Sequence, residues 1–202
     1  MQSQAIAALF VTGWLLAGDA YAQPIIAGEP GTYWSADFSA SGLFSPGIGQ
    51  ATTAVGGSGS VALVRTRNVP ADLRTTCIGA KVTFAQEWSE FGSATGARRE
   101  QWFVAGPVWE MHDETESVFA SLHPFAGAKR SAWSRPDGGS VDVSSLAFGV
   151  RLSLGVGIAP IGGNQAAIRI FDVTYLIAPA DPVSPHRVVF SAGLDISRRL
   201  RR

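Results

Sequence analysis

The stretch Ser145-Leu-Ala-Phe-Gly-Val-Arg-Leu-Ser-Leu154 alternates large apolar residues with polar or small ones. Successive side chains of a β-strand point to opposite faces, so this pattern predicts a strand with one apolar and one polar face. The same period of two recurs at residues 34–41, 78–84 and 187–196. Four such segments in one chain indicate an all-β protein.

Four weaker segments extend the series: Gly59–Arg67, Gln101–Glu110, Val118–Lys129 and Ala166–Ile177. The total is eight candidate strands, each close to the roughly nine to eleven residues that a tilted transmembrane strand needs. Glycine and proline are scattered between them, which leaves almost no room for a long helix. We therefore expect an antiparallel, up-and-down, eight-stranded β-barrel.

The expected connections between these strands alternate in character. Asn68–Arg74 and His112–Glu116 are short, whereas Ser45–Gly57, Trp88–Arg99 and Ser131–Val143 are longer and rich in Gly, Ser and Thr. Short turns at one end and longer loops at the other are typical of the periplasmic and external ends of an outer-membrane barrel.

The first residues of the chain have the pattern of an export signal. An apolar run, Ala5–Gly18, precedes a small-residue site at Ala20-Tyr-Ala22, where we expect cleavage after Ala22. The run has fourteen residues, short of the roughly twenty that a helical membrane span needs. Met1–Gln4 lacks the Lys or Arg of a typical signal. We expect residues 1–22 to be a signal peptide and residues 23–202 to form one domain.

The charge of the chain is balanced. Lys and Arg number 16 and Asp and Glu number 16, so loss of Asp19 with the signal peptide would leave 16 basic and 15 acidic residues. This balance gives no electrostatic basis for binding nucleic acid. The single cysteine, Cys77, cannot close an internal disulfide, and we expect it to be a small buried side chain rather than a reactive thiol.

The direction of the apolar faces separates two kinds of barrel. A soluble, lipocalin-like barrel turns its apolar face inward around a core or ligand, whereas an outer-membrane barrel turns it toward lipid. The polar faces here carry Ser, Gly and isolated charges rather than the dense Lys and Glu of a solvent-facing sheet. Aromatic residues near strand ends fit interfacial girdles; they include Trp34, Trp102, Trp109 and Tyr175. We therefore expect residues 23–202 to be a transmembrane barrel in the bacterial outer membrane, with a soluble, exported ligand-binding barrel as the alternative.

The isolated charges then point into the barrel. An eight-stranded barrel is just wide enough for its own side chains, so we expect no general diffusion pore. The predicted polar network of the lumen consists of Asp37, Lys81, Arg151, Asp172, Arg187 and Asp195. We expect Asp172 and Thr174 to pair with Arg151 or Arg187 on the neighbouring strands.

The sequence contains no strong motif for catalysis or metal binding. The histidines His112, His123 and His186 lack a ligand spacing such as H-x-x-x-H, and neither a nucleophile elbow nor a phosphate-binding loop is present. We interpret His112–Glu116 as a polar turn, because a calcium site needs roughly six to eight converging oxygens. No catalytic residue, metal or cofactor is therefore predicted.

From Gly59 onward, six short segments of the chain resemble a known protein family in their order and spacing. They are Gly59–Arg65, Ile78–Phe84, Phe103–Pro107, Pro124–Ala128, Ile168–Leu176 and Arg187–Leu194. Their order and spacing, over about two thirds of the chain, resemble the small outer-membrane β-barrel domain family, the OmpA-like eight-stranded barrels. Such barrels commonly end on an aromatic residue, whereas this chain ends Ser197-Arg-Arg-Leu-Arg-Arg202. We expect the basic tail to be a solvated periplasmic end or to contact anionic lipid.

The resemblance implies outer-membrane lipid, lipopolysaccharide and the barrel-assembly machinery as partners, in a Gram-negative cell envelope. Some barrels of this kind trim or transfer acyl chains of lipid A, and the deacylases place a His and a Ser two residues apart on a late strand. The comparable stretch here is Asp172-Val-Thr174, and Asp cannot replace the imidazole base at neutral pH without a large pKa shift. We therefore predict a non-enzymatic protein that is structural in the envelope or binds through its loops, with a lipid A-modifying enzyme as the less favoured alternative.

Overall fold

The computed structural model describes residues 31–44, 53–69, 74–90, 97–112, 118–134, 138–161, 164–181 and 185–199. The expected signal peptide, residues 1–22, lies outside these ranges, so its cleavage stays a prediction. Within them, no helix has the length and apolar character needed to cross a membrane.

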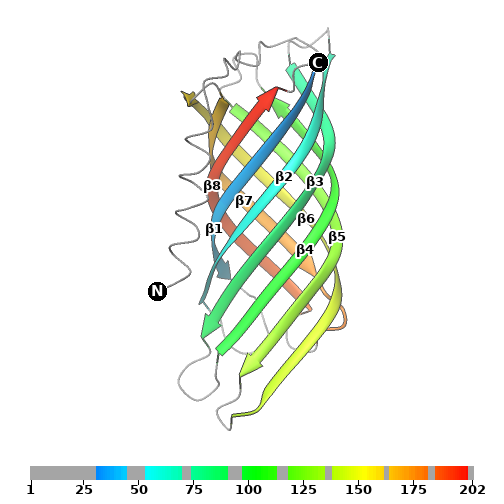
Figure 1. The fold of residues 1–202 in the computed structure, drawn as a ribbon, viewed down its shortest axis with the longest axis vertical. Coiled ribbons are helices and arrows are strands. Elements are labelled where there is room, and N and C mark those ends of the chain that lie inside the picture. Colours follow the sequence, from blue (N-terminus) through cyan, green and yellow to red (C-terminus); the bar gives the residue numbers. More distant parts are fainter. Residues whose placement is uncertain are drawn as a thin grey trace.

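Eight antiparallel strands follow one another in chain order and close into a barrel (Figure 1). They are β1 (Thr32–Phe44), β2 (Thr53–Val69), β3 (Arg74–Glu90), β4 (Ala97–His112), β5 (Val118–Ser134), β6 (Ser140–Ile161), β7 (Asn164–Ile177) and β8 (His186–Arg199). The barrel closes where β1 pairs with β8, with Asp37 opposite Asp195. The expected all-β, up-and-down, eight-stranded architecture is confirmed.

The strands are longer than the sequence pattern indicated. They contain from 13 residues in β1 to 22 in β6. The segments Ser45–Gly57, Trp88–Arg99 and Ser131–Val143, predicted as loops, are therefore strand in part: β2 already begins at Thr53, for example. Their high content of Gly, Ser and Thr led to the prediction of loops. A β-strand accepts these residues wherever its pairing with the neighbouring strand continues.

The two ends of the barrel differ. At one end, which we call the terminal end, β1 begins, β8 finishes, and residues 70–73, 113–117 and 162–163 connect the strands. At the other, which we call the loop end, the connections are residues 45–52, 91–96, 135–139 and 178–185. The connections at the loop end are generally longer, which agrees with the prediction of short turns at one end and longer loops at the other.

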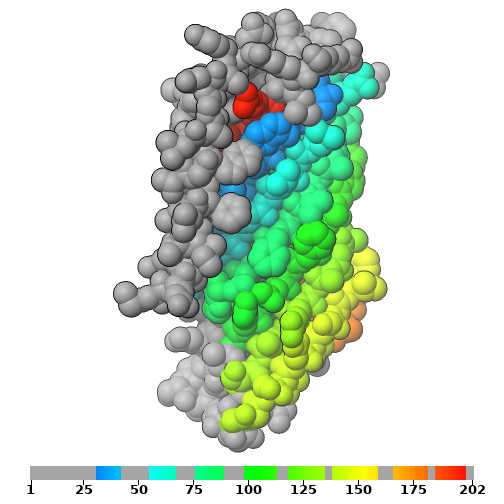
Figure 2. All heavy atoms as spheres, viewed as in Figure 1, coloured from blue at the N-terminus to red at the C-terminus, as the bar shows by residue number. Residues whose placement is uncertain are grey.

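The polarity of the barrel is the reverse of that of a soluble protein. Large apolar side chains stand on its outer surface; they include Phe38, Leu63, Phe84, Phe103, Leu146, Leu152, Ile170 and Phe190. Most buried side chains on the inner face are polar or charged. Figure 2 shows the outer wall over β2–β5 as a continuous surface of side chains. The apolar faces predicted from the alternation therefore point outward.

Glycines allow the narrow barrel to curve tightly. A Cβ atom added to Gly79 would lie 2.0 Å from the carbonyl oxygen of Leu63, and one added to Gly127 would lie 2.1 Å from that of Phe103. Only glycine permits backbones to approach so closely. Gly79 on β3 and Gly127 on β5 add no side chain to the barrel interior, which is occupied by side chains from other positions.

Candidate functional site

Two groups of buried charges occupy the barrel interior. The terminal cluster contains Asp37, Lys81, Arg151, Arg169, Asp172 and Asp195, and the loop-end cluster contains Glu87, Arg98, Glu100, Lys129, Asp181 and Arg187. Each cluster holds three acids and three bases. A buried charge is costly unless it is paired, and the equal numbers allow every charge in each cluster to have a partner.

The register of the sheet explains the centre of the terminal cluster. Asp37 on β1 lies directly opposite Asp195 on β8, so two carboxylates face the same side of the wall. Arg169 of β7 lies between them: its Nη2 atom is 3.0 Å from Asp37 Oδ2 and 2.6 Å from Asp195 Oδ2. Lys81 Nζ reaches Asp37 Oδ2 from β3 at 2.5 Å. The Arg169 guanidinium therefore bridges two acids that would otherwise repel each other, and Lys81 supplies the second positive charge.

A bidentate pair adjoins this centre. Arg151 Nε donates to Asp172 Oδ1 and Oδ2 at 2.7 and 2.8 Å, and Arg151 Nη2 donates to Oδ2, across the β6–β7 pair. Asp172 also lies 3.6 Å from Arg169 Nη1, and Arg151 Nη1 lies 3.5 Å from Asp37 Oδ1. The terminal cluster is thus one connected network of side chains from β1, β3, β6, β7 and β8.

The loop-end cluster depends on a residue outside the strands. Asp181 Oδ2 accepts hydrogen bonds from Arg98 at 2.9 Å, from Lys129 at 2.7 Å and from Ser131 at 3.0 Å. Two backbone hydrogen bonds shape the segment that carries it, from Asp181 N to Ala178 O and from Ala178 N to Pro185 O. The chain after β7 therefore folds inward across the loop end, and its carboxylate enters the barrel.

Two further carboxylates complete the loop-end cluster. Glu100 contacts Arg98 and Arg187, and its Oε1 lies 3.3 Å from Lys129 Nζ. Arg187 Nη1 lies 3.1 Å from Glu87 Oε2. The Arg98 guanidinium lies over the Trp133 ring, 5.0 Å from its centroid. Charges from β3, β4, β5 and β8 are thus joined to Asp181.

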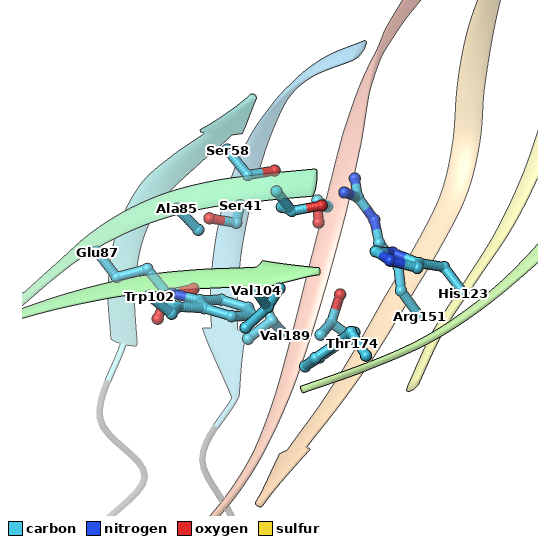
Figure 3. Close-up of a pocket in the computed structure, with 13 residues that line it drawn as sticks. Ser41, Ser58, Ala85, Glu87, Trp102, Val104, His123, Arg151, Thr174 and Val189 are labelled. Carbon is cyan, nitrogen blue, oxygen red and sulfur yellow. The ribbon is translucent and has the colours of Figure 1, made fainter. Parts of the chain in front are cut away.

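An apolar layer adjoins the loop-end charges inside the barrel. It includes Trp102, Val104, Phe125, Leu176 and Val189, and the rings of Trp102 and Phe125 are 6.5 Å apart. Beside it lies a cavity of about 10 Å³, enough for about one water molecule. His123 and Arg151 border the cavity together with Thr83 and Thr174 (Figure 3). A cavity of this size excludes a bound ligand larger than water.

All six residues of the predicted lumen network lie in the interior, but in two places. Asp37, Lys81, Arg151, Asp172 and Asp195 belong to the terminal cluster, with Arg151 as the partner of Asp172. Arg187 belongs to the loop-end cluster. Thr174 is buried beside the cavity.

The sequence pattern missed half of the charges in the two clusters. Arg169 was missed because β7 has a bulge: the register shifts between Arg169 and Asp172, so two residues three apart both point inward. A strict period of two cannot place both on one face. Arg98 was missed because it lies in Trp88–Arg99, a segment predicted as a loop. Asp181 was missed because it lies beyond the end of β7.

Trp102, predicted to lie in an interfacial girdle, lies inside the barrel instead. Trp102 is 7% exposed and packs inside the barrel on Phe125, because the inner face of β4 follows the even-numbered residues from Arg98 to Val108. Trp109 and Tyr175 are exposed on the outer surface, and Trp34 is partly exposed. The girdle prediction is therefore wrong for Trp102, whose direction the weak alternation of this strand did not fix.

Solved structures with the same architecture include small bacterial outer-membrane barrels. Neisserial surface protein A aligns with 82% of this chain and 96% of its own length, at 15% identity and a TM-score of 0.54. This chain has the fold of a small outer-membrane β-barrel. The attachment invasion locus protein Ail of Yersinia pestis aligns with 84% of this chain and 99% of its own, at 18% identity and a TM-score of 0.48. No protein-family model and no curated protein matches the sequence.

Proposed function

We propose that the protein is a non-enzymatic, integral protein of the bacterial outer membrane, exported through a cleaved signal peptide. The observation that carries this proposal is the reversed polarity of the barrel. Phe103 and Leu146, at 58% and 68% exposure, stand on the outer surface, while Lys81 and Arg169 are buried within. An apolar outer surface is stable against lipid and unfavourable in water. Outer-membrane lipid, lipopolysaccharide and the barrel-assembly machinery are the partners this location requires.

Aromatic side chains near both ends of the wall support this placement. Trp109 and Trp34 are near the terminal end, and Trp88 and Tyr175 are near the loop end. Their outward position suits the two interfaces of a bilayer, where amphipathic rings lie at the level of the head groups.

The interior supports a structural role over the alternatives. Charged clusters and the apolar layer fill it, and the cavity of about 10 Å³ has no room for the ligand of a lipocalin-like binder. Asp172 and Thr174, the stretch comparable to a deacylase pair, are buried and face away from lipid. Asp172 is also held by Arg151. A group that cannot reach the acyl chains of lipid A cannot cleave them.

The loop end offers one element for contacts outside the membrane. Pairing between β6 and β7 starts only at Phe148, so residues 140–147 of β6 pair with β5 alone among the described residues. The β5–β6 hairpin therefore extends beyond the end of β7 (Figure 1), while β4 pairs with β5 as far as Trp133. Its Arg130 and Asp142 form an exposed ion pair, and Gly138, with φ of 83°, lies at its tip. We place the interaction role on this hairpin.

The membrane location is tested by cell fractionation and gel mobility. We expect the protein in the outer-membrane fraction, soluble only in detergent, and with a mobility that changes on boiling because the closed barrel resists detergent until heated. Recovery from the periplasm or medium without detergent, together with uptake of a fluorescent apolar probe, would replace the proposal by the soluble ligand-binding barrel.

The interaction role is tested by trimming the hairpin. Residues 134–140 are replaced by an Asn-Gly turn, which joins the register partners Trp133 and Val141 and keeps Trp133 beside Arg98. Adhesion of bacteria that display the protein to immobilised proteins and glycans is compared with the full chain. We expect adhesion to be lost while the heat-dependent mobility is kept. A matched control shortens residues 113–117 at the terminal end. Equal adhesion of the full and trimmed proteins would restrict the role to the structure of the envelope.

A further inference from the structure

A third group of side chains lies at the terminal end, outside the two charged clusters. It consists of Cys77 on β3 and of Glu110 and His112 on β4. The thiol sulfur, a carboxylate oxygen and an imidazole nitrogen of these residues all lie within 4.8 Å of one another. We propose that these three residues form a binding site for a borderline-soft divalent cation, with Zn²⁺ as the best-fitting ion.

The strand register brings the three residues together. Glu110 and His112 are two positions apart on β4 and so share a face, and Cys77 is the register partner of Glu110 on β3. Cys77 and Glu110 are 5% and 7% exposed, while His112 is partly exposed. No linear sequence motif indicates this arrangement. The ligands come from two strands, and the two on β4 are two residues apart, a spacing that helical zinc motifs do not use.

The donor set suits zinc in particular. Thiolate, imidazole and carboxylate are the ligands that Zn²⁺ takes in proteins, and three protein ligands leave one position for water. Calcium and magnesium prefer oxygen ligands only. Zinc–ligand distances of about 2.0–2.3 Å require the donor atoms to draw together by roughly one ångström.

The surroundings leave the three groups available. Among the described residues, the ion pair formed by Glu110 is with His112, whose Nε2 is 3.7 Å from Glu110 Oε2. The nearby cations Lys81 and Arg169 are bound to Asp37. The His112 ring stacks on Phe119 with centroids 5.8 Å apart, which fixes the plane of the imidazole. Cys77 forms no disulfide.

Binding requires the loss of protons. The Cys77 thiol must release its proton to water, and His112 must bind through a neutral ring nitrogen, so metal uptake releases protons and strengthens as the pH rises. The bound ion would join the ends of β3 and β4 at the terminal end. The site does not depend on the membrane location, so its test and that of the proposed function can fail separately.

The site is tested with Co²⁺ and Zn²⁺ added to the full chain folded in detergent. Co²⁺ bound to a thiolate absorbs by sulfur-to-metal charge transfer, and Cys77 is the chain's single cysteine. We expect this absorption to appear, to be displaced by Zn²⁺, and to vanish in Cys77→Ser. Glu110→Gln and His112→Gln should each weaken Zn²⁺ binding more than about 100-fold, since changes outside the ligand set already cost about 10- to 100-fold.

His186→Gln is the matched control. This histidine lies at the loop end and stacks on Tyr175, so its loss should leave the Co²⁺ spectrum unchanged. A second measurement needs no variant: Zn²⁺ should slow alkylation of Cys77 in the original chain. Absence of the thiolate absorption in the correctly folded protein, or unchanged binding in Glu110→Gln and His112→Gln, would overturn the proposal.

Discussion

The two charged clusters have the same numbers of acids and bases but are built differently. Each contains three acids and three bases. Every member of the terminal cluster lies on a strand, so its position follows from the register of the closed barrel. The loop-end cluster is centred on Asp181, which lies beyond β7 and reaches the interior through a folded segment. The terminal cluster is therefore fixed by the wall itself, and the loop-end cluster by the wall together with a connection outside the strands.

This difference predicts that the terminal cluster contributes more to the stability of the barrel. Its carboxylates cannot leave the interior without a change in the wall, so the loss of a partner leaves a buried, unpaired charge. At the loop end, Asp181 lies outside the strands, so moving its carboxylate to water breaks the two backbone hydrogen bonds of its own segment and no strand pairing. The following substitutions test that contrast.

Arg169→Leu should have the largest effect. Asp195 pairs with Arg169 and lies opposite Asp37, so the loss of Arg169 removes the ion pair of Asp195 and leaves it beside a second carboxylate, while Asp37 keeps Lys81. We expect the free energy of unfolding to fall by about 5 kcal/mol, the upper end for breaking a buried pair. The measurement is the midpoint of urea unfolding in lipid vesicles, followed by tryptophan fluorescence. A midpoint equal to that of Arg130→Leu, which removes an exposed arginine, would contradict the role of the cluster.

Arg151→Leu should come next. It removes the bidentate partner of Asp172, but this carboxylate keeps Arg169 at 3.6 Å. We expect a loss of about 3 kcal/mol, the lower end for such pairs. An unchanged unfolding midpoint would show that Asp172 does not need Arg151. A double variant with Asp172→Asn supplies the control, because it removes the stranded charge and should recover part of the stability.

The same contrast explains what the sequence could and could not predict. Asp37, Lys81 and Arg151 follow strict alternation, so the pattern placed them inside the barrel. Arg169 needs the bulge in β7, which depends on pairing with β6 and β8 and leaves no mark in a single sequence. Asp181 needs the fold of a connection after the strand. Periodicity predicts what a regular wall determines, whereas bulges and inward loops depend on tertiary pairing.

Asp181→Asn should have a smaller effect than either arginine substitution. It removes the charge that Arg98 and Lys129 share, but both cations keep Glu100. We expect a loss of about 2 kcal/mol, within the range for a weakened buried hydrogen-bonding group. Faster hydrogen exchange should be confined to the segment at 178–181 and the adjoining strand ends. A loss as large as that of Arg169→Leu would remove the distinction between the two clusters.

Asp142→Asn should have the smallest effect and marks the lower limit of the series. Asp142 pairs with Arg130 on the projecting hairpin, where both side chains are exposed. Water and salt screen such a pair, so its loss should not measurably change the urea midpoint. Asp142 and Asp172 each accept three hydrogen bonds from one arginine, so a larger loss in Asp172→Asn than in Asp142→Asn would come mainly from the burial of Asp172. A measurable loss in Asp142→Asn that persists at high salt would mean that the hairpin packs against another surface and is not free in water, because salt screens a buried pair much less than an exposed one.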